Sequence, residues 1–230
     1  MRRVEFAKHW LQQEAKDPGL FRTFAFSDES YFCCGDTRHW HWCEEDEPPT
    51  AITREKYTAK CHKFAVITFD GYRTARLPAS GEGSGASGGC NSKDFLAALK
   101  KIDGLREFLD DKKLILDGAS IHNSRETQEW LAKQRFELIC GGREKTVQAW
   151  PPHSPDLNPI ENWWALLKKH VGAGECAVIT GNTPAVRDTL HEAIKDAAKE
   201  TPKEHFENLI DSFKTRLERC IATNGKWIGY

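Results

Sequence analysis

Short apolar and aromatic runs, bounded by acidic, glycine or proline residues, predict strands in the first half of the chain. The predicted strands are Thr23–Asp28, Tyr31–Cys34, His39–Cys43, Phe64–Phe69 and Tyr72–Leu77, with Asp70-Gly71 as a hairpin turn. Two similar runs follow in the second half, at Lys113–Asp117 and Phe136–Ile139. The chain therefore contains enough strands for one sheet.

Helical spacing of apolar residues dominates the rest of the chain. It predicts helices over Lys93–Ile102 and Arg125–Lys133, one after Asn158, and two closing helices that begin near Thr183-Pro184 and Thr201-Pro202. Residues 201–204 also have the pattern of a capping box. Strands first, then alternating strands and helices, predict an α/β fold in which helices cover a mixed sheet.

Several residues favour the start of a helix directly after Asn158. Asn158 suits the N-cap, Pro159 suits the first helical position, and Glu161 falls where it can complete a capping box. One face of this helix is apolar, at Ile160, Trp163, Trp164, Leu167 and Val171. Glu161 is therefore either a capping residue or a carboxylate held at the edge of the core for chemistry.

Two aspartates favour the second interpretation. Asp28 and Asp117 each end an apolar run, and sites in open α/β sheets collect where the strands end. If both converge with Glu161, three carboxylates share a small volume, and like charges raise one another's pKa. A hard divalent cation resolves that conflict, and oxygen-rich sites favour Mg²⁺ or Mn²⁺.

These residues lie in three ordered motifs that resemble the mariner superfamily of DDE transposases. The segment Phe26–Ser30 reads FSDES, Asp117, Ala119 and His122 match the second motif, and Trp150–Asn162 matches the family's WPxxSPDLNPIEN almost letter for letter. Two departures lie near the second motif: Gly118 replaces the usual Asn, which predicts a freer loop after Asp117, and Gly141–Thr146 looks like an insertion.

The resemblance implies a ribonuclease H-like fold with a mixed five-stranded sheet flanked by helices. It also implies cut-and-paste DNA transposition, with phosphodiester hydrolysis and strand transfer, by two Mg²⁺ ions, for which Mn²⁺ can substitute, held by Asp28, Asp117 and Glu161. The expected partners are transposon ends and target DNA, without a nucleotide cofactor or a membrane. The alternative is a decayed or domesticated relative that binds DNA or protein without cutting. Expected DNA-binding residues are His122, Arg125, Lys168 and Lys169. His122 fits a loop-stabilising role equally well.

The resemblance also predicts the organisation of the chain. Residues 1–20 are expected to be the remnant of an interdomain linker, and residues 21–230 to be the catalytic domain. The given sequence is not expected to include the helix-turn-helix region that precedes the catalytic domain in relatives. The acidic segment Glu44–Pro49 resembles a clamp loop through which relatives contact a second subunit, which makes a homodimer a further expectation.

Charge, hydropathy and cysteine content limit the kinds of protein that this chain could be. The formal charge of −1 is low for a DNA-binding protein, so binding depends on local clusters of Lys and Arg. No apolar run approaches the roughly 18 residues of a membrane span. Eight cysteines without a secretion signal predict reduced thiols in an intracellular protein, nuclear in a eukaryote and cytoplasmic otherwise.

Two other patterns point to different classes of protein. A cluster of cysteine and histidine residues suggests a zinc-stabilised module as one alternative. The cluster consists of Cys33, Cys34, His39, His41, Cys43, Cys61 and His62. Its spacing fits no standard zinc module. Residues 83–88 spell GxGxxG, but within a Gly/Ser-rich stretch that favours a flexible connection over a nucleotide site.

Overall fold

Five strands form one mixed sheet at the centre of the molecule, in the order β3-β2-β1-β4-β5. The computed structural model describes residues 2–34, 58–79, 81–85, 88–142, 146–174, 176 and 180–229. The strands are β1 (Phe24–Cys33), β2 (Lys60–Thr68), β3 (Gly71–Leu77), β4 (Lys113–Leu116) and β5 (Glu137–Cys140). Pairing is antiparallel among β1, β2 and β3 and parallel among β1, β4 and β5.

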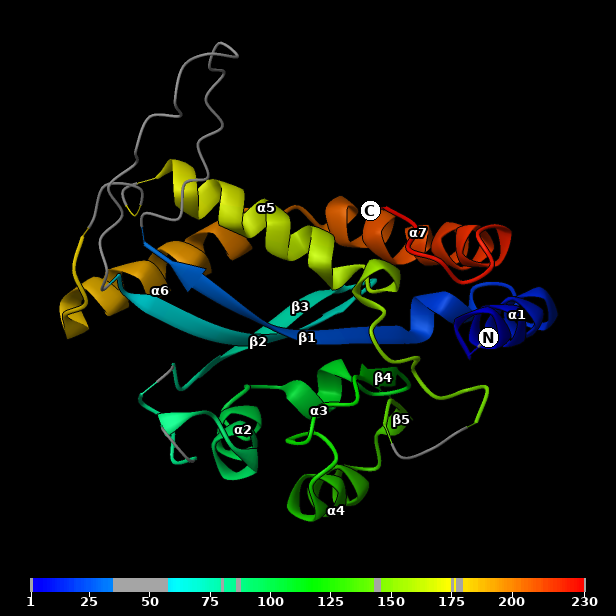
Figure 1. Cartoon of the computed structure of the whole chain (residues 1–230), viewed down its shortest axis with the longest axis horizontal. Coiled ribbons are helices and arrows are strands. Elements are labelled where there is room, and N and C mark those ends of the chain that lie inside the picture. The colour runs from blue at the N-terminus through cyan, green and yellow to red at the C-terminus, as the bar shows by residue number, and fades with distance from the viewer. Residues whose placement is uncertain are drawn as a thin grey trace, which may run out of the picture.

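Helices cover both faces of this sheet (Figure 1). One face carries α5 (Ile160–Ala173), α6 (Pro184–Lys199) and α7 (Lys203–Ala222), and the other carries α2 (Ser92–Leu99), α3 (Leu105–Phe108) and α4 (Arg125–Gln134). Two 3₁₀ turns, η1 (Leu20–Thr23) and η3 (Pro155–Leu157), precede β1 and α5. The predicted mixed five-stranded sheet flanked by helices is confirmed. In the described part of the chain, no helix combines the length and apolar character needed to cross a bilayer.

Two apolar clusters hold the layers together, one on each side of the sheet. Phe24 and Phe26 of β1 face the cluster under α5 and α7, whereas Ala25 between them faces the cluster under α2. This alternation follows from the period of two along a strand. The first cluster is rich in aromatic side chains: the ring centroids of Phe26 and Phe213 lie 4.8 Å apart, and Trp163 is fully buried.

The first helix belongs to the aromatic cluster. Residues Arg2–Lys16 form α1, which packs against α7 at one end of the molecule (Figure 1). Phe6 is 1% and Trp10 is 7% exposed, and the Trp10 ring lies 5.0 Å from that of Phe24. Most of the expected linker segment, residues 1–20, is thus an ordered helix in the core; that it joins the domain to a DNA-reading region stays a prediction.

Some predicted elements differ from the observed ones. Tyr31–Cys34 is not a separate strand, because pairing with β2 continues without a break from Phe26 to Cys33. The predicted strand His39–Cys43 lies outside the described residues. The capping box predicted at residues 201–204 is wrong: α7 has no side-chain cap, and the Thr201 hydroxyl accepts a hydrogen bond from Trp163 Nε1 instead (3.1 Å).

Candidate active site

Asp28 and Asp117 lie where the parallel strands at the centre of the sheet stop pairing. The register of β1 with β4 ends at the pair Phe26–Ile115, so Asp28 comes two residues after the last paired position. Asp117 directly follows the last residue of β4. The sequence predicted that Asp28 would end its strand, but β1 continues to Cys33. Asp28 instead lies beside the point where the neighbouring strand β4 ends. The carboxyl edge of the β1–β4 pair therefore carries both aspartates.

Glu161 joins them because the start of α5 is tied to β1. Asn158 Nδ2 donates a hydrogen bond to the Ser27 carbonyl (3.1 Å), and its Oδ1 accepts one from the Ile160 amide (3.3 Å). One turn further along, Trp164 Nε1 donates to Asp28 Oδ2 (3.2 Å). The predicted capping box is wrong: Pro159 occupies the N-cap position, and Asn158 reaches only the first amide of α5. Glu161 is consequently not committed to its own helix.

All three carboxylates line one pocket of about 440 Å³. Its wall also includes Arg2 of α1, Gly118 and Gly142 from the loops after β4 and β5, and the proline-rich segment before α5. The three residues that the sequence singled out are thus brought together by segments far apart in the chain. Arg2 was missed, because nothing in its sequence neighbourhood points to this pocket.

The pKa values of Asp28 and Glu161 are both raised in this pocket. Burial, together with the charges of Glu161 and Glu29, raises the pKa of Asp28 to about 8. Burial also raises the pKa of Glu161, although the charge of Lys168 and a hydrogen bond with Asp28 offset part of that rise. Because Asp28 keeps its proton near neutral pH, the two groups avoid facing each other as two full negative charges.

Asp117 has a different environment, because His122 is clamped between two carboxylates. The distances from His122 Nδ1 to Asp117 Oδ1 and from Nε2 to Glu29 Oε1 are both 2.7 Å. Burial by itself lowers the pKa of His122, but these two hydrogen bonds outweigh it and raise the pKa to about 10. For Asp117 burial opposes the same effect, and hydrogen bonds from His122 and the Ala119 amide hold its pKa below the usual range.

The role of His122 follows from this position. The residue is 1% exposed and both ring nitrogens are engaged, which argues against the predicted contact with DNA and for the loop-stabilising alternative. Glu29 follows Asp28 in β1 and therefore lies on the opposite face of the strand. It was missed as part of the site, since its contact with His122 joins residues 93 positions apart.

The loop after Asp117 is held more firmly than its sequence predicted. The Ala119 amide donates to Asp117 Oδ1 (2.9 Å), and the amides of His122 and Asn123 both donate to the Ala119 carbonyl. A Cβ added at Gly141 would lie 2.8 Å from the Gly118 amide nitrogen. The two loops therefore pass each other with room for a glycine at position 141 and no larger residue.

The donor set suits a divalent cation, although it is not closed in the conformation seen. Asp28, Asp117 and Glu161 supply only carboxylate oxygens, the ligands that Mg²⁺ and Mn²⁺ prefer. Burial, followed by the charges of Glu161 and Glu29, raises the pKa of Asp28, and a bound cation would offset both effects. Among the described residues, however, no three acidic, histidine or cysteine side chains are gathered tightly enough to hold an ion. Asp117 Oδ1 is engaged by His122 and the Ala119 amide, which leaves Oδ2 as the oxygen available to an ion.

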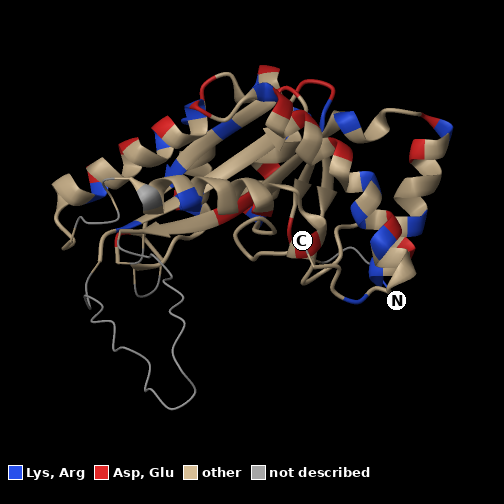
Figure 2. Cartoon of the chain, turned by 90° about the horizontal axis from the view of Figure 1, so that it is seen from above, with Lys and Arg blue, Asp and Glu red and all other residues tan. Residues whose placement is uncertain are grey.

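The remaining predicted DNA-binding residues lie on two different helices. Lys168 and Lys169 are exposed on α5, with Lys168 close enough to Glu161 to affect its pKa. Arg125 begins α4 on the other face of the sheet, where its exposed guanidinium pairs with Glu129. Basic and acidic residues are interspersed over the helices (Figure 2). Lys168 and Lys169 are therefore the better placed to contact a DNA strand entering the pocket.

The described members of the cysteine and histidine cluster divide between two faces of the sheet: Cys34 lies close enough to Cys61 to have its pKa affected, but His62 faces the other way. Cys61 Sγ lies 3.9 Å from His191 Nδ1, whereas the neighbouring His62 stacks on Tyr31 and bonds the Pro78 carbonyl. These two residues lie on opposite faces of β2 because they are consecutive. The other members His39, His41 and Cys43 lie outside the described residues.

A mixed sheet with two aspartates at the end of its central parallel pair, joined by Glu161 of α5, defines a ribonuclease H-like domain with an acidic pocket. The profile of the DDE superfamily endonuclease family matches residues 23–177, and the chain belongs to this family.

Transposases are among the similar proteins. The chain is 26% identical over 235 residues to the transposable element Tc3 transposase of Caenorhabditis elegans, an alignment that covers 100% of this chain and 63% of that protein. It is 21% identical over 220 residues to the Tcb2 transposase of Caenorhabditis briggsae, covering 81% of this chain and 72% of the relative. The chain thus spans somewhat less than two thirds of the Tc3 transposase.

Solved structures of the Mos1 mariner transposase share the fold. The paired-end complex with Mn superposes with a TM-score of 0.70 at 16% identity, covering 99% of this chain and 63% of that one. The isolated Mos1 catalytic domain superposes with a TM-score of 0.65 at 15% identity, covering 99% and 94%. The similarity extends over nearly the whole of the present chain, α1 included.

Proposed function

We propose that this chain is the catalytic domain of a cut-and-paste DNA transposase. The observation that carries the proposal is the convergence of Asp28, Asp117 and Glu161 on one pocket of a DDE endonuclease fold. Similar proteins are transposases, and Mos1 structures include complexes with transposon ends. The decayed alternative has less support, because all three carboxylates are present and the pocket is formed.

The three carboxylates would hold two Mg²⁺ or Mn²⁺ ions, the metals present in the Mos1 complexes. Such ions supply an activated water or 3′-hydroxyl and stabilise the charge on the phosphoryl group and the leaving oxygen. We assign Asp28 to both ions and Asp117 and Glu161 to one each. Asp28 would have to lose its proton to bind a metal ion. Because its pKa is raised, partly by the charge of Glu161, this deprotonation becomes favourable only when the ions neutralise the negative charge of the pocket.

The surrounding residues position these groups and the substrate. Glu29 and the His122 imidazolium hold the Asp117 carboxylate, while Asn158 and Trp164 fix the start of α5 relative to Asp28. Lys168 and Lys169, with Arg2 in the pocket wall, supply positive charge for DNA phosphates. The partners are transposon ends and target DNA, reached in the nucleus of a eukaryotic cell. A homodimer through Glu44–Pro49 is also part of the proposal, although that segment lies outside the described residues.

A nicking assay on supercoiled plasmid with Mg²⁺, Mn²⁺ or Ca²⁺ tests this function. We expect the wild type to cleave the plasmid with Mg²⁺ and Mn²⁺. We expect the cleavage rate to fall by orders of magnitude in Asp28→Ala, Asp117→Ala and Glu161→Ala. Glu218→Ala, which removes an exposed carboxylate of α7, is the matched control and should cleave like the wild type. DNA binding without cleavage under every metal condition would favour the decayed alternative.

A further inference from the structure

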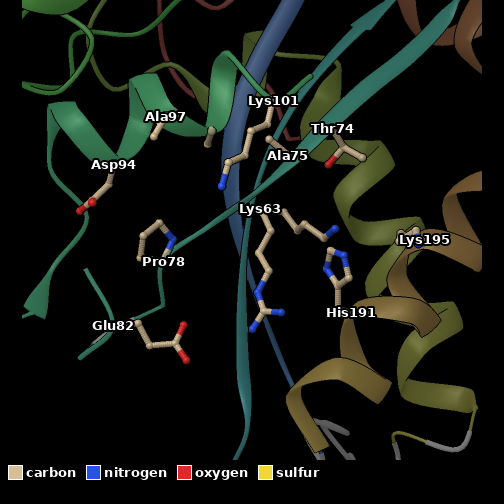
Figure 3. Close-up of a pocket in the computed structure, with 12 residues that line it drawn as sticks. Lys63, Thr74, Ala75, Pro78, Glu82, Asp94, Ala97, Lys101, His191 and Lys195 are labelled. Atoms are coloured by element: carbon tan, nitrogen blue, oxygen red, sulfur yellow. The ribbon is translucent and has the colours of Figure 1, made fainter. Parts of the chain in front are cut away.

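A second cavity, of about 680 Å³, lies at the edge of the sheet away from the carboxylate pocket. Its walls come from β2, β3, the segment around α2 and one side of α6. Figure 3 shows Lys63 of β2 and His191 of α6 pointing toward one another inside it, with Lys101 reaching in from the end of the α2 segment. Arg76 of β3 and Lys195 of α6 complete the basic lining.

Lys63 is the residue that this fold alone does not explain. Its side chain is 1% exposed and points into the cavity, and within the described part of the chain no carboxylate lies within ion-pair distance of its ammonium, so the charge of Glu192 acts on it only from further away. Burial, together with the charges of Arg76 and Lys195, lowers its pKa to about 8. An ammonium that is buried without a counter-ion costs several kcal/mol of stability. Such a charge is retained where a ligand provides the missing anion.

The acidic residues of the cavity are already engaged elsewhere. Glu82 bonds the Ala79 amide and pairs with Arg187, and Asp94 bonds Ser84 and Asn91. The other two cations have partners of their own: Arg76 pairs with Asp188, and Lys195 with Glu192. Lys63 and Lys101 are therefore the cations of this lining for which the described residues provide no acidic partner.

We propose that this cavity binds a phosphomonoester, carried by a free nucleotide or by the 5′ end of a DNA strand. A dianion matches the two uncompensated ammonium groups, and lysine is a common point-charge ligand of phosphate. The volume is that of a small-molecule site. Burial and the charges of Lys63 and Arg76 lower the pKa of His191 to about 4, so His191 is neutral and can take up a proton as the anion arrives. The site is separate from DNA cleavage and does not depend on it.

Thermal unfolding in metal-free buffer with EDTA tests the proposal. The probes are inorganic phosphate, dAMP, and one single-stranded oligonucleotide with either a 5′-phosphate or a 5′-hydroxyl, with sodium chloride at equal ionic strength as the salt control. Phosphate-bearing probes are expected to raise the unfolding temperature, and to raise the pKa of His191 in an NMR titration. Effects of dAMP and inorganic phosphate identify a free ligand, and an effect of the phosphorylated oligonucleotide alone identifies a DNA end.

Two variants separate the site from general charge effects. Lys63→Met should weaken phosphate binding at least tenfold and raise stability without ligand, since a buried unpaired charge is lost. Lys101→Met, whose side chain is exposed and not needed for folding, should weaken binding several-fold. Lys8→Met, exposed on α1, is the control and should bind like the wild type. The proposal would be overturned if phosphate did not specifically raise the unfolding temperature of the wild type. It would also be overturned if phosphate raised the unfolding temperature of Lys63→Met and Lys101→Met as much as that of the wild type.

Discussion

Asp156 lies five residues before Glu161 in the same proline-rich segment, yet its surroundings give it a different role. Its side chain is fully buried, accepts hydrogen bonds from Arg3 Nη1 (2.7 Å) and the Ile228 amide (3.1 Å), and so joins η3, the turn before α5, to both ends of the described chain. Asp156→Asn leaves the Arg3 guanidinium, 15% exposed, without its counter-charge. Urea unfolding should show a loss of about 3 kcal/mol.

Asp211→Asn is the matched control for this ion pair. Asp211 pairs with Arg22 at the surface, where the two side chains are 47% and 56% exposed, so its loss should cost less than about 1 kcal/mol. Equal losses in the two variants would mean that Asp156 is no more structural than a surface carboxylate.

The same ion pair predicts a pH dependence of stability. Burial opposes ionisation of Asp156, but the hydrogen bond from Arg3 outweighs it, and the pKa of Asp156 is lowered. A carboxyl group with a depressed folded-state pKa stabilises the fold above its unfolded pKa of about 4, and this contribution is lost as pH falls through the folded-state pKa. The stability difference between wild type and Asp156→Asn should therefore be full at pH 7 and shrink below pH 4. A constant difference down to pH 2 would contradict this account.

At the scale of elements, the start of α5 determines whether the site forms. Asn158→Ala removes the hydrogen bond to Ser27 that ties α5 to β1 and the one that caps the Ile160 amide. Stability should fall by about 1–2 kcal/mol, and cleavage should fall at least tenfold because Glu161 is no longer fixed beside Asp28. Thr183→Ala removes the cap of α6, far from the pocket, and should cost similar stability while leaving cleavage intact. If both variants cleave like the wild type, α5 is not positioned by Asn158.

Local patterns predicted these elements well where the signal itself is local. The apolar period predicted the five strands and every described helix except α1 and α3, and the predicted start of α6 near Thr183-Pro184 is confirmed. The two capping boxes were wrong because tertiary partners compete for the same side chains: Asn158 bonds β1, and Thr201 bonds Trp163. Asp117 and Glu161 could be named because one follows a strand and the other begins a helix, whereas Asp28, which lies inside β1, could be named from the motif around it. Glu29, Arg2 and the Arg3–Asp156 pair could not, since their contacts cross most of the chain.

At the scale of the whole molecule, α1 is part of the same packing unit as the sheet. Trp10 is 7% exposed and contacts Phe24 and Phe6 edge to face. Trp10→Ala should therefore cost about 3–5 kcal/mol in urea unfolding. Leu11→Ala, at a partly buried position of the same helix, is the control with an expected smaller loss. A change within about 0.5 kcal/mol for Trp10→Ala would mean that residues 1–20 behave as the linker that the sequence predicted.

The whole account depends on Glu161 acting as a metal-binding catalytic carboxylate. The most direct measurement is the rate of Mg²⁺-dependent plasmid nicking by Glu161→Gln, with its unfolding free energy determined in the same metal-free protein preparation. Gln keeps the size and hydrogen-bonding capacity of Glu but is a poor ligand for Mg²⁺. The account predicts that nicking falls by orders of magnitude while stability stays equal or rises, because Gln removes a partly buried charge that burial disfavours. A Glu161→Gln protein that nicks plasmid at the wild-type rate would contradict it.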